Sequence, residues 1–144
     1  MELKLSSLKD ITCVKTPQYN VEEVIKNTKE NPIWLHFGAG NIFRGYIARL
    51  QDDLLNKGLC DKGIIAAETF DFEIIDQIYD AYDNLTMLAT LSATKPVDYR
   101  VVASVVEGVK ASSIERLKEI IVNPSLQFIS FTITEKGYGL RGLD

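Results

Sequence analysis

The sequence has few of the residues that build metal centres and disulfide frameworks. Its 144 residues include two cysteines, Cys13 and Cys60, and a single histidine, His36. The cysteines are far apart in the chain and form no Cys-x-x-Cys pair, so neither a zinc site nor a disulfide framework is predicted. We expect no metal and two unrelated reduced thiols.

Long apolar runs and an excess of positive charge are also absent. No stretch approaches the roughly 20 apolar residues that cross a membrane, and residues 1–4 lead into polar residues rather than the apolar core of a signal peptide. The net charge is -4 and the pI is about 5.1, with the basic residues dispersed. Such a chain has no general attraction to nucleic acid or to anionic membranes. We therefore expect a cytoplasmic protein that binds neither.

The chain has the composition of one globular domain, organised around residues 31–45. Hydrophobic residues make up 46% and charged residues 25% of the sequence, which is ordinary for a folded domain. Residues 33–37 follow a proline and are apolar at four of five positions, which predicts a buried parallel strand. A glycine turn follows, and then a predicted helix with one apolar stripe facing the core. The residues of that stripe are Phe43, Ile47, Leu50 and Leu54.

The glycine turn has the spacing of the first two glycines of the dinucleotide-binding fingerprint. Gly38 and Gly40 fit this pattern, whereas Phe43 occupies the place of the third glycine, so we expect the helix and strand to lie farther apart than usual. The alternative is an ordinary turn that uses glycine for positive φ, which leaves Arg44 unexplained. Free amides at the helix start, the helix dipole and Arg44 together predict an anion site. A P-loop is excluded because no Gly-Lys-Ser/Thr follows the glycines.

A second buried strand is predicted over residues 63–68, which makes the first unit a right-handed parallel crossover. Glu68 falls at the carboxyl end of this strand, where a carboxylate can accept hydrogen bonds from a ribose diol. It would also repel a ribose 2′-phosphate and so favour NAD over NADP. The alternative for Glu68 is a solvated acid in a loop.

The remaining pattern completes an α/β fold. We predict a helix over residues 21–29 that Asn20 caps, and a helix from Asp71 to Tyr82. A third helix, capped by Ser112 or Ser113, is predicted to run through Val122, with Ile114, Leu117 and Ile121 facing inward. Apolar and β-branched runs at residues 85–91 and 97–106 predict a β-hairpin, and residues 127–133 a final strand. Thr134, Glu135 and Lys136 follow this strand and are candidates for a cofactor crevice, or simply a polar loop. His36 is predicted to be a hydrogen-bonded structural residue rather than a proton carrier.

Two blocks of sequence resemble the polyol-specific long-chain dehydrogenases, the mannitol dehydrogenase family. The run His-Phe-Gly-Ala-Gly-Asn-Ile-Phe-Arg at residues 36–44 is similar to the family's Gly-x-Gly-x-x-x-Arg signature. Thr-Ile-Thr-Glu-Lys-Gly-Tyr at residues 132–138 resembles its Thr-x-Thr-Glu-Lys-Gly-Tyr segment. Residues 68–71 and 82–85 resemble the fructuronate reductase (mannonate oxidoreductase) branch. The similarity extends over about residues 30 to 140.

The resemblance implies a fold, a domain plan and a cofactor. It implies a Rossmann-like, doubly wound and mainly parallel sheet with an inserted β-hairpin, incomplete without the rest of a parent chain. Residues 1–144 would form the N-terminal dinucleotide-binding domain, with residues 1–30 as a peripheral lead-in. A C-terminal helical domain, absent here, would carry the catalytic lysine, asparagine and histidine, so no catalytic residue is assigned in this chain. The implied NAD-binding residues are Gly38, Ala39, Gly40, Asn41, Ile42, Phe43, Arg44, Glu68, Thr134 and Glu135.

The function implied is that of an NAD-dependent oxidoreductase acting on CH-OH groups. The leading hypothesis is interconversion of a keto-sugar acid and an aldonate, fructuronate and mannonate. Mannitol 2-dehydrogenase or tagaturonate reductase activity stays open, as does a non-catalytic nucleotide-binding module. An adenosylmethionine-dependent methyltransferase would also place an acid after its second strand, but its ligand has no pyrophosphate for Arg44. The expected partners are a sugar acid or polyol and the C-terminal domain of the parent chain.

Overall fold

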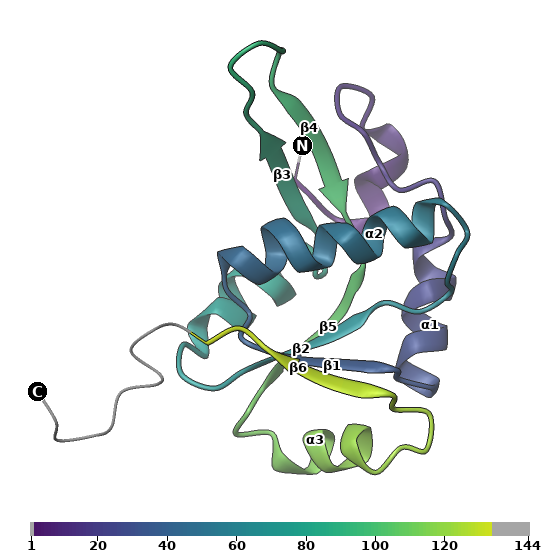
Figure 1. Ribbon diagram of the computed structural model, residues 1–144, viewed down its shortest axis with the longest axis vertical. Coiled ribbons are helices and arrows are strands. Elements are labelled where there is room, and N and C mark those ends of the chain that lie inside the picture. The colour runs from purple at the N-terminus through teal and green to yellow at the C-terminus, as the bar shows by residue number, and fades with distance from the viewer. Residues whose placement is uncertain (1, 134–144) are drawn as a thin grey trace, which may run out of the picture.

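Four parallel strands form the central sheet of the computed structural model, which describes residues 2–133 (Figure 1). The strands lie in the order β5 (Val105–Lys110), β2 (Ile64–Glu68), β1 (Trp34–Phe37) and β6 (Phe128–Phe131). All three neighbouring pairs are parallel. Within this sheet the chain order is therefore third, second, first, fourth, which is the first part of the doubly wound Rossmann order. The predicted fold class is confirmed.

Helices cover both faces of the sheet, and Figure 1 shows α2 (Ala48–Asn56) and α3 (Ile114–Ile121) on opposite sides of it. The α3 face carries a core to which α1 (Val21–Glu30) also contributes, with Val24, Leu35, Ile65, Val106, Leu117 and Ile120 among its buried side chains. The α2 face also includes η3 (Ile75–Tyr79), which contacts β5, and η4 (Asp80–Tyr82) follows η3 in the chain. The buried core of this face includes Phe43, Ala48, Ile64, Ala66, Ile75 and Tyr79.

The first and last helices begin close to where the sequence predicts. Asn20 caps α1, its Oδ1 accepting a hydrogen bond of 3.2 Å from the backbone N–H of Glu23. In α3, Leu117 faces inward as predicted, but the second inward residue is Ile120, whereas Ile114 and Ile121 are about half exposed. The prediction for those two isoleucines is wrong because only one side of this short helix contacts the sheet. A 3-10 helix, η1 (Leu5–Asp10), precedes α1.

A π-helical turn, η2 (Phe43–Ile47), lies between the glycine turn and α2. The backbone N–H of Ala48 donates to the carbonyl oxygen of Phe43, five residues earlier, so the turn holds one residue more than an α-helical turn. That extra residue rotates everything after it about the helix axis. Leu50 and Leu54 are consequently 47% and 41% exposed, and Ala48 and Leu55 are buried instead. The predicted apolar stripe is therefore correct at Phe43 and wrong beyond Ile47.

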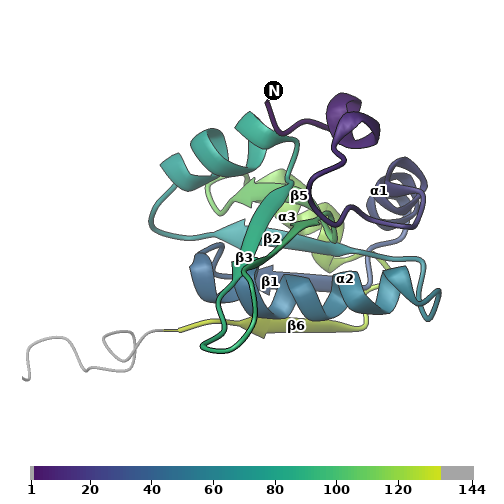
Figure 2. The same ribbon diagram turned by 90° about the horizontal axis from the view of Figure 1, so that it is seen from above.

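The inserted hairpin consists of β3 (Thr86–Thr90) and β4 (Asp98–Val102), which pair antiparallel and rise away from the sheet (Figure 1). Seen from above, the hairpin lies in front of the sheet (Figure 2). The prediction of one strand over residues 97–106 is wrong, because this stretch changes sheets at Ala103 and Ser104. Both residues are buried, and the Ser104 carbonyl accepts from the N–H of Ile64 at 2.8 Å. Residues 105–110 then form β5 of the main sheet. Among residues 2–133 no helix is long and apolar enough to cross a membrane.

Candidate functional site

Gly38 begins the turn at the carboxyl end of β1 and can only be glycine. Its φ is +109°, and a Cβ atom at this position would lie 2.3 Å from Oγ1 and 2.9 Å from the carbonyl oxygen of Thr132. Its own N–H donates to the Ala67 carbonyl at 2.8 Å. The backbone therefore passes between β2 and the end of β6 with no room for a side chain.

Gly40, in contrast to Gly38, lies beside open space, because a Cβ atom there would meet no protein atom within 4 Å. Its carbonyl accepts from the N–H of Arg44 at 3.1 Å, so the helix begins here. The amides of Asn41, Ile42 and Phe43 belong to the first turn, where N–H groups have no intrahelical acceptor. Open space, free amides and the positive end of the helix dipole together form a place where an anionic group can approach the backbone.

Two buried side chains hold Ala39, the middle residue of the turn. The Ala39 N–H donates to Oε2 of Glu68 at 2.9 Å, and its carbonyl accepts from the Tyr79 hydroxyl at 2.8 Å. One of these side chains comes from the end of β2 and the other from η3. The turn is therefore fixed from two neighbouring elements before any ligand arrives.

Glu68 lies at the carboxyl end of β2 as predicted, but it is 8% exposed and is not a solvated loop acid. Its Oε1 accepts from the amides of Thr69 at 2.8 Å and Phe70 at 3.0 Å. Burial alone would raise the pKa of the Glu68 carboxyl, but hydrogen bonds from the backbone amides around it outweigh burial and lower the pKa. The side chain is therefore a fixed negative charge beside the glycine turn.

Arg44 supplies a cation at the same helix start. Its Nη2 donates to Oδ1 of Asn41, while its Nε is buried and has no hydrogen-bond partner among the described residues. Burial raises the pKa of the nearby Tyr79 hydroxyl, and the charge of Arg44 partly offsets this effect. A guanidinium charge next to free helix amides fits an anionic ligand.

His36 is fully buried beneath the turn and is hydrogen-bonded on both ring nitrogens, as its predicted structural role requires. Its Nδ1 lies 2.7 Å from Oγ of Ser130, and its Nε2 lies 3.2 Å from Oγ1 of Thr132. The imidazole also stacks on Phe43 with ring centroids 4.2 Å apart and planes 9° apart. Phe43 thus fills the space between strand and helix at the place where the fingerprint has its third glycine. Burial lowers the pKa of His36 to about 4, so the ring is neutral at pH 7.

Three residues of this site were not predicted from the sequence as part of it. Tyr79 belongs to a run of apolar residues at helical spacing, and that run gives no sign of its bond to Ala39. Ser130 in β6 and Thr132 just after it alternate with apolar residues, which indicates a polar side of the strand but not that this side faces His36. Thr134 and Glu135, with Lys136, lie outside the described residues.

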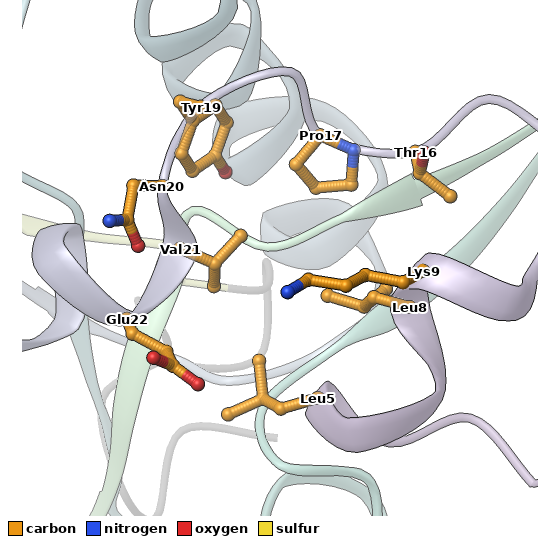
Figure 3. A pocket seen from close by; sticks show the side chains of 9 residues that line it. All are labelled: Leu5, Leu8, Lys9, Thr16, Pro17, Tyr19, Asn20, Val21 and Glu22. Carbon is orange, nitrogen blue, oxygen red and sulfur yellow. The ribbon is translucent and has the colours of Figure 1, made fainter.

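A separate pocket of about 380 Å³ lies between η1 and the start of α1 (Figure 3). The side chains of Lys9, Tyr19 and Glu22 are among those that line it, and Gln18 in the same loop donates its N–H to Asn56 at the end of α2. This pocket contains none of the predicted site residues. Within the described part of the chain, no group of three or more His, Cys, Asp or Glu side chains is arranged to hold a metal ion.

Comparison with known proteins agrees with the resemblance seen in the two sequence blocks. No family model matches the chain. It is 45% identical to a D-mannonate oxidoreductase of Thermotoga maritima over 98% of this chain and 28% of that protein. A mannitol 2-dehydrogenase of Pseudomonas fluorescens, solved as a ternary complex with NAD and D-mannitol, is 28% identical with a TM-score of 0.81 over 96% of this chain and 28% of that one.

A second solved structure supports the fold alone. It is a D-sorbitol dehydrogenase in substrate-free form, 22% identical, with a TM-score of 0.82 over 99% of this chain and 29% of that one. The chain thus spans less than a third of the length of each of these relatives. The D-mannonate oxidoreductase and the mannitol 2-dehydrogenase confirm the predicted resemblance to the mannitol dehydrogenase family. The two solved structures confirm the predicted fold.

Proposed function

Because the chain resembles the mannitol dehydrogenase family in sequence and fold, we propose that it is the cofactor-binding part of an NAD-dependent oxidoreductase that interconverts a keto-sugar acid and an aldonate. The proposed pair is fructuronate and mannonate, since the relative at 45% identity is a D-mannonate oxidoreductase. Residues 1–144 would be the N-terminal dinucleotide-binding domain, with residues 1–30 as its lead-in. The more distant mannitol 2-dehydrogenase, 28% identical, supports mannitol oxidation as the second candidate.

The observation that carries this proposal is the open space at Gly40. A dinucleotide pyrophosphate needs close approach to backbone amides, and Gly40 leaves that approach free while the rest of the turn is tightly packed. The amides of Asn41, Ile42 and Phe43 would bind the phosphate oxygens, and Arg44 would donate its guanidinium to the same charge. Because Ala39 is already fixed on both sides, little ordering would be needed on binding.

The adenosine end of the cofactor would lie toward β2. Glu68 already accepts three backbone hydrogen bonds through its two oxygens, and a carboxylate offers about four acceptor positions. The backbone amide of Asp71 also interacts with this carboxylate, so a ribose hydroxyl would share one of its oxygens with a backbone amide. The fixed negative charge would repel a 2′-phosphate, which favours NAD. Thr134 and Glu135 remain proposed cofactor residues, and both lie outside the described residues.

When bound, the nicotinamide supplies the hydride chemistry, and the residues of this chain hold and orient the dinucleotide. His36 is buried and neutral beneath the turn, so it is not placed to exchange protons with a substrate. The proton-transfer residues are proposed to lie in the helical C-terminal domain of the parent chain. Its substrate, a sugar acid or polyol, would contact that domain.

The test is an NADH titration of the Gly40→Val variant by calorimetry, in this chain and in the full-length parent protein. Valine at Gly40 should leave the fold intact, because its Cβ meets no protein atom, and should weaken NADH binding at least tenfold by filling the approach to the amides. The matched control is Gly45→Ala in the same helix, where a Cβ meets only Cδ1 of Leu88 at 3.8 Å and binding should not change. A folded Gly40→Val protein that binds NADH as tightly as the original contradicts the assignment.

A further inference from the structure

We propose that His36 is a positioning residue for the glycine turn, acting through a one-directional hydrogen-bond chain that runs from Trp34 through Ser130, His36 and Thr132 to the carbonyl of Gly38. In this hydrogen-bond chain His36 is the Nε2–H tautomer. The inference rests on the proposed function, because the turn it orients is the one assigned to the pyrophosphate.

The direction of the chain is set at its start by Trp34. The indole Nε1–H can only donate, and it lies 2.7 Å from Oγ of Ser130. Ser130 therefore accepts from Trp34 and has its own hydroxyl proton for another acceptor. The Nδ1 atom of His36 is 2.7 Å away on its other side. Among residues 2–133 the Ser130 hydroxyl has no other acceptor within hydrogen-bond distance, so it donates to Nδ1, and the ring proton is on Nε2.

The second half of the chain leads to the turn. The Nε2–H of His36 faces Oγ1 of Thr132 at 3.2 Å, and the Thr132 hydroxyl donates to the Gly38 carbonyl, also at 3.2 Å. Strand register makes these contacts possible, because His36 pairs with Ser130 across β1 and β6. The N–H of Thr132 continues the ladder by donating to the Phe37 carbonyl at 2.9 Å.

The peptide group between Gly38 and Ala39 is held at both ends. Thr132 binds its carbonyl oxygen, and Glu68 binds its N–H at 2.9 Å. The orientation of this peptide determines where the chain enters Gly40 and the first helical amides. The imidazole of His36, stacked on Phe43, thereby connects the strand, the turn and the helix start.

The chain has one histidine and one tryptophan, and both belong to this hydrogen-bond chain. Nitrogen NMR of the 15N-histidine-labelled protein therefore reports the tautomer of His36 without ambiguity. We expect an unprotonated Nδ1 and a protonated Nε2. An Nδ1–H tautomer, or an equal mixture of the two, overturns the inference.

The consequence for the turn is tested with a matched pair of substitutions, Thr132→Val and Thr132→Ser. Valine keeps the shape but removes the acceptor for His36 and the donor to Gly38, so NADH binding should weaken about tenfold. Serine keeps the hydroxyl and should bind NADH within about twofold of the original. Ser130→Ala removes the hydroxyl that donates to Nδ1 and should shift the His36 tautomer. If the valine variant does not fold, NADH binding by Ser130→Ala tests the positioning role instead.

Two outcomes separate this inference from the proposed function. If Gly40→Val weakens NADH binding at least tenfold but folded Thr132→Val binds as well as the original, the positioning role is wrong and the proposed function stands. If the unsubstituted chain and its full-length parent bind no NADH, the proposed function is wrong and the cofactor consequence is overturned with it. The tautomer measurement then still decides the hydrogen-bond chain.

Discussion

Gly38 and Gly40 stand two residues apart in one turn, and the chain needs each of them for a different physical reason. Gly38 has a positive φ and a neighbour, Thr132, that leaves no space for a Cβ. Gly40 has space on the protein side and is needed only if a ligand comes close. Gly38 is therefore needed for folding, and Gly40 for binding a ligand.

Gly38→Ala is predicted to destabilise the fold by about 2 kcal/mol or more, through left-handed strain and overlap with Thr132. Gly40→Ala is predicted to change the free energy of unfolding by less than about 1 kcal/mol. Urea unfolding of the two variants measures both values. Equal destabilisation by the two alanines would show that the turn does not have the described geometry.

His36 gives the protein a pH-dependent stability that can be isolated because it is the sole histidine. Its pKa is about 4 in the folded state against an ordinary 6.5, so the unfolded chain binds more protons between these values. Stability is therefore complete above about pH 7 and falls as the pH drops toward 4, by about 3 kcal/mol in total. Urea unfolding of the original protein between pH 4.5 and pH 7.5 should show this slope.

His36→Gln supplies the reference curve for that experiment. Burial raises the pKa of the Asp52 carboxyl, so Asp52 acts in the opposite direction as the pH falls, but it does so equally in both proteins. The difference between the two curves belongs to the imidazole. A difference that does not vary with pH would mean that His36 is not buried as a neutral ring.

At the scale of the element, the π turn η2 decides which side of α2 is buried. Leu54 and Leu55 are adjacent and chemically identical, yet Leu54 is 41% exposed and Leu55 is 3% exposed. Leu55→Ala should cost about 2 to 5 kcal/mol of stability, whereas Leu54→Ala should cost less than about 1 kcal/mol. Thermal or urea unfolding of this matched pair shows which side of α2 is buried. A larger loss of stability in Leu54→Ala than in Leu55→Ala would support the apolar stripe predicted from the sequence.

The sequence predicts elements that depend on local pattern and fails where distant contacts decide. The strands around residues 33–37 and 63–68 and the cap at Asn20 follow from short apolar runs and capping chemistry, and the structure confirms them. The helix phase after Ile47 was missed because periodicity assumes an unbroken α-helix. The switch of sheets at Ala103 was missed because β4 and β5 have the same β-branched composition.

The residues of the candidate site also fall into those that local sequence predicts and those that distant contacts bring together. Gly38, Gly40 and Arg44 were predicted as site residues because a turn between strand and helix has a recognisable sequence, and Glu68 because it falls at the carboxyl end of a predicted strand. Tyr79, Ser130 and Thr132 were not, since each becomes part of the site only through the register of strands far apart in the chain.

At the scale of the whole molecule, the chain spans 28% of the length of the D-mannonate oxidoreductase it resembles. On the proposed domain plan, the catalytic groups belong to the remainder of the parent protein. The isolated chain is therefore predicted to have no NADH-dependent activity with fructuronate, tagaturonate or fructose, and none with NAD and mannitol. Absorbance of NADH is the measurement, with the full-length parent as the positive control. Turnover by rigorously purified chain would place proton transfer within these 144 residues and make His36 and Lys136 candidates for it.

The most direct test of the central claim is to map where NADH touches the molecule. Backbone amide NMR of the 15N-labelled chain, titrated with NADH, reports every amide at once. We predict the largest shifts at Gly40, Asn41, Ile42 and Arg44, with smaller ones near Glu68 and none around the pocket between η1 and α1. Shifts centred on that pocket, or no shift at any amide of the glycine turn at saturating NADH, would contradict the claim that this turn holds the cofactor.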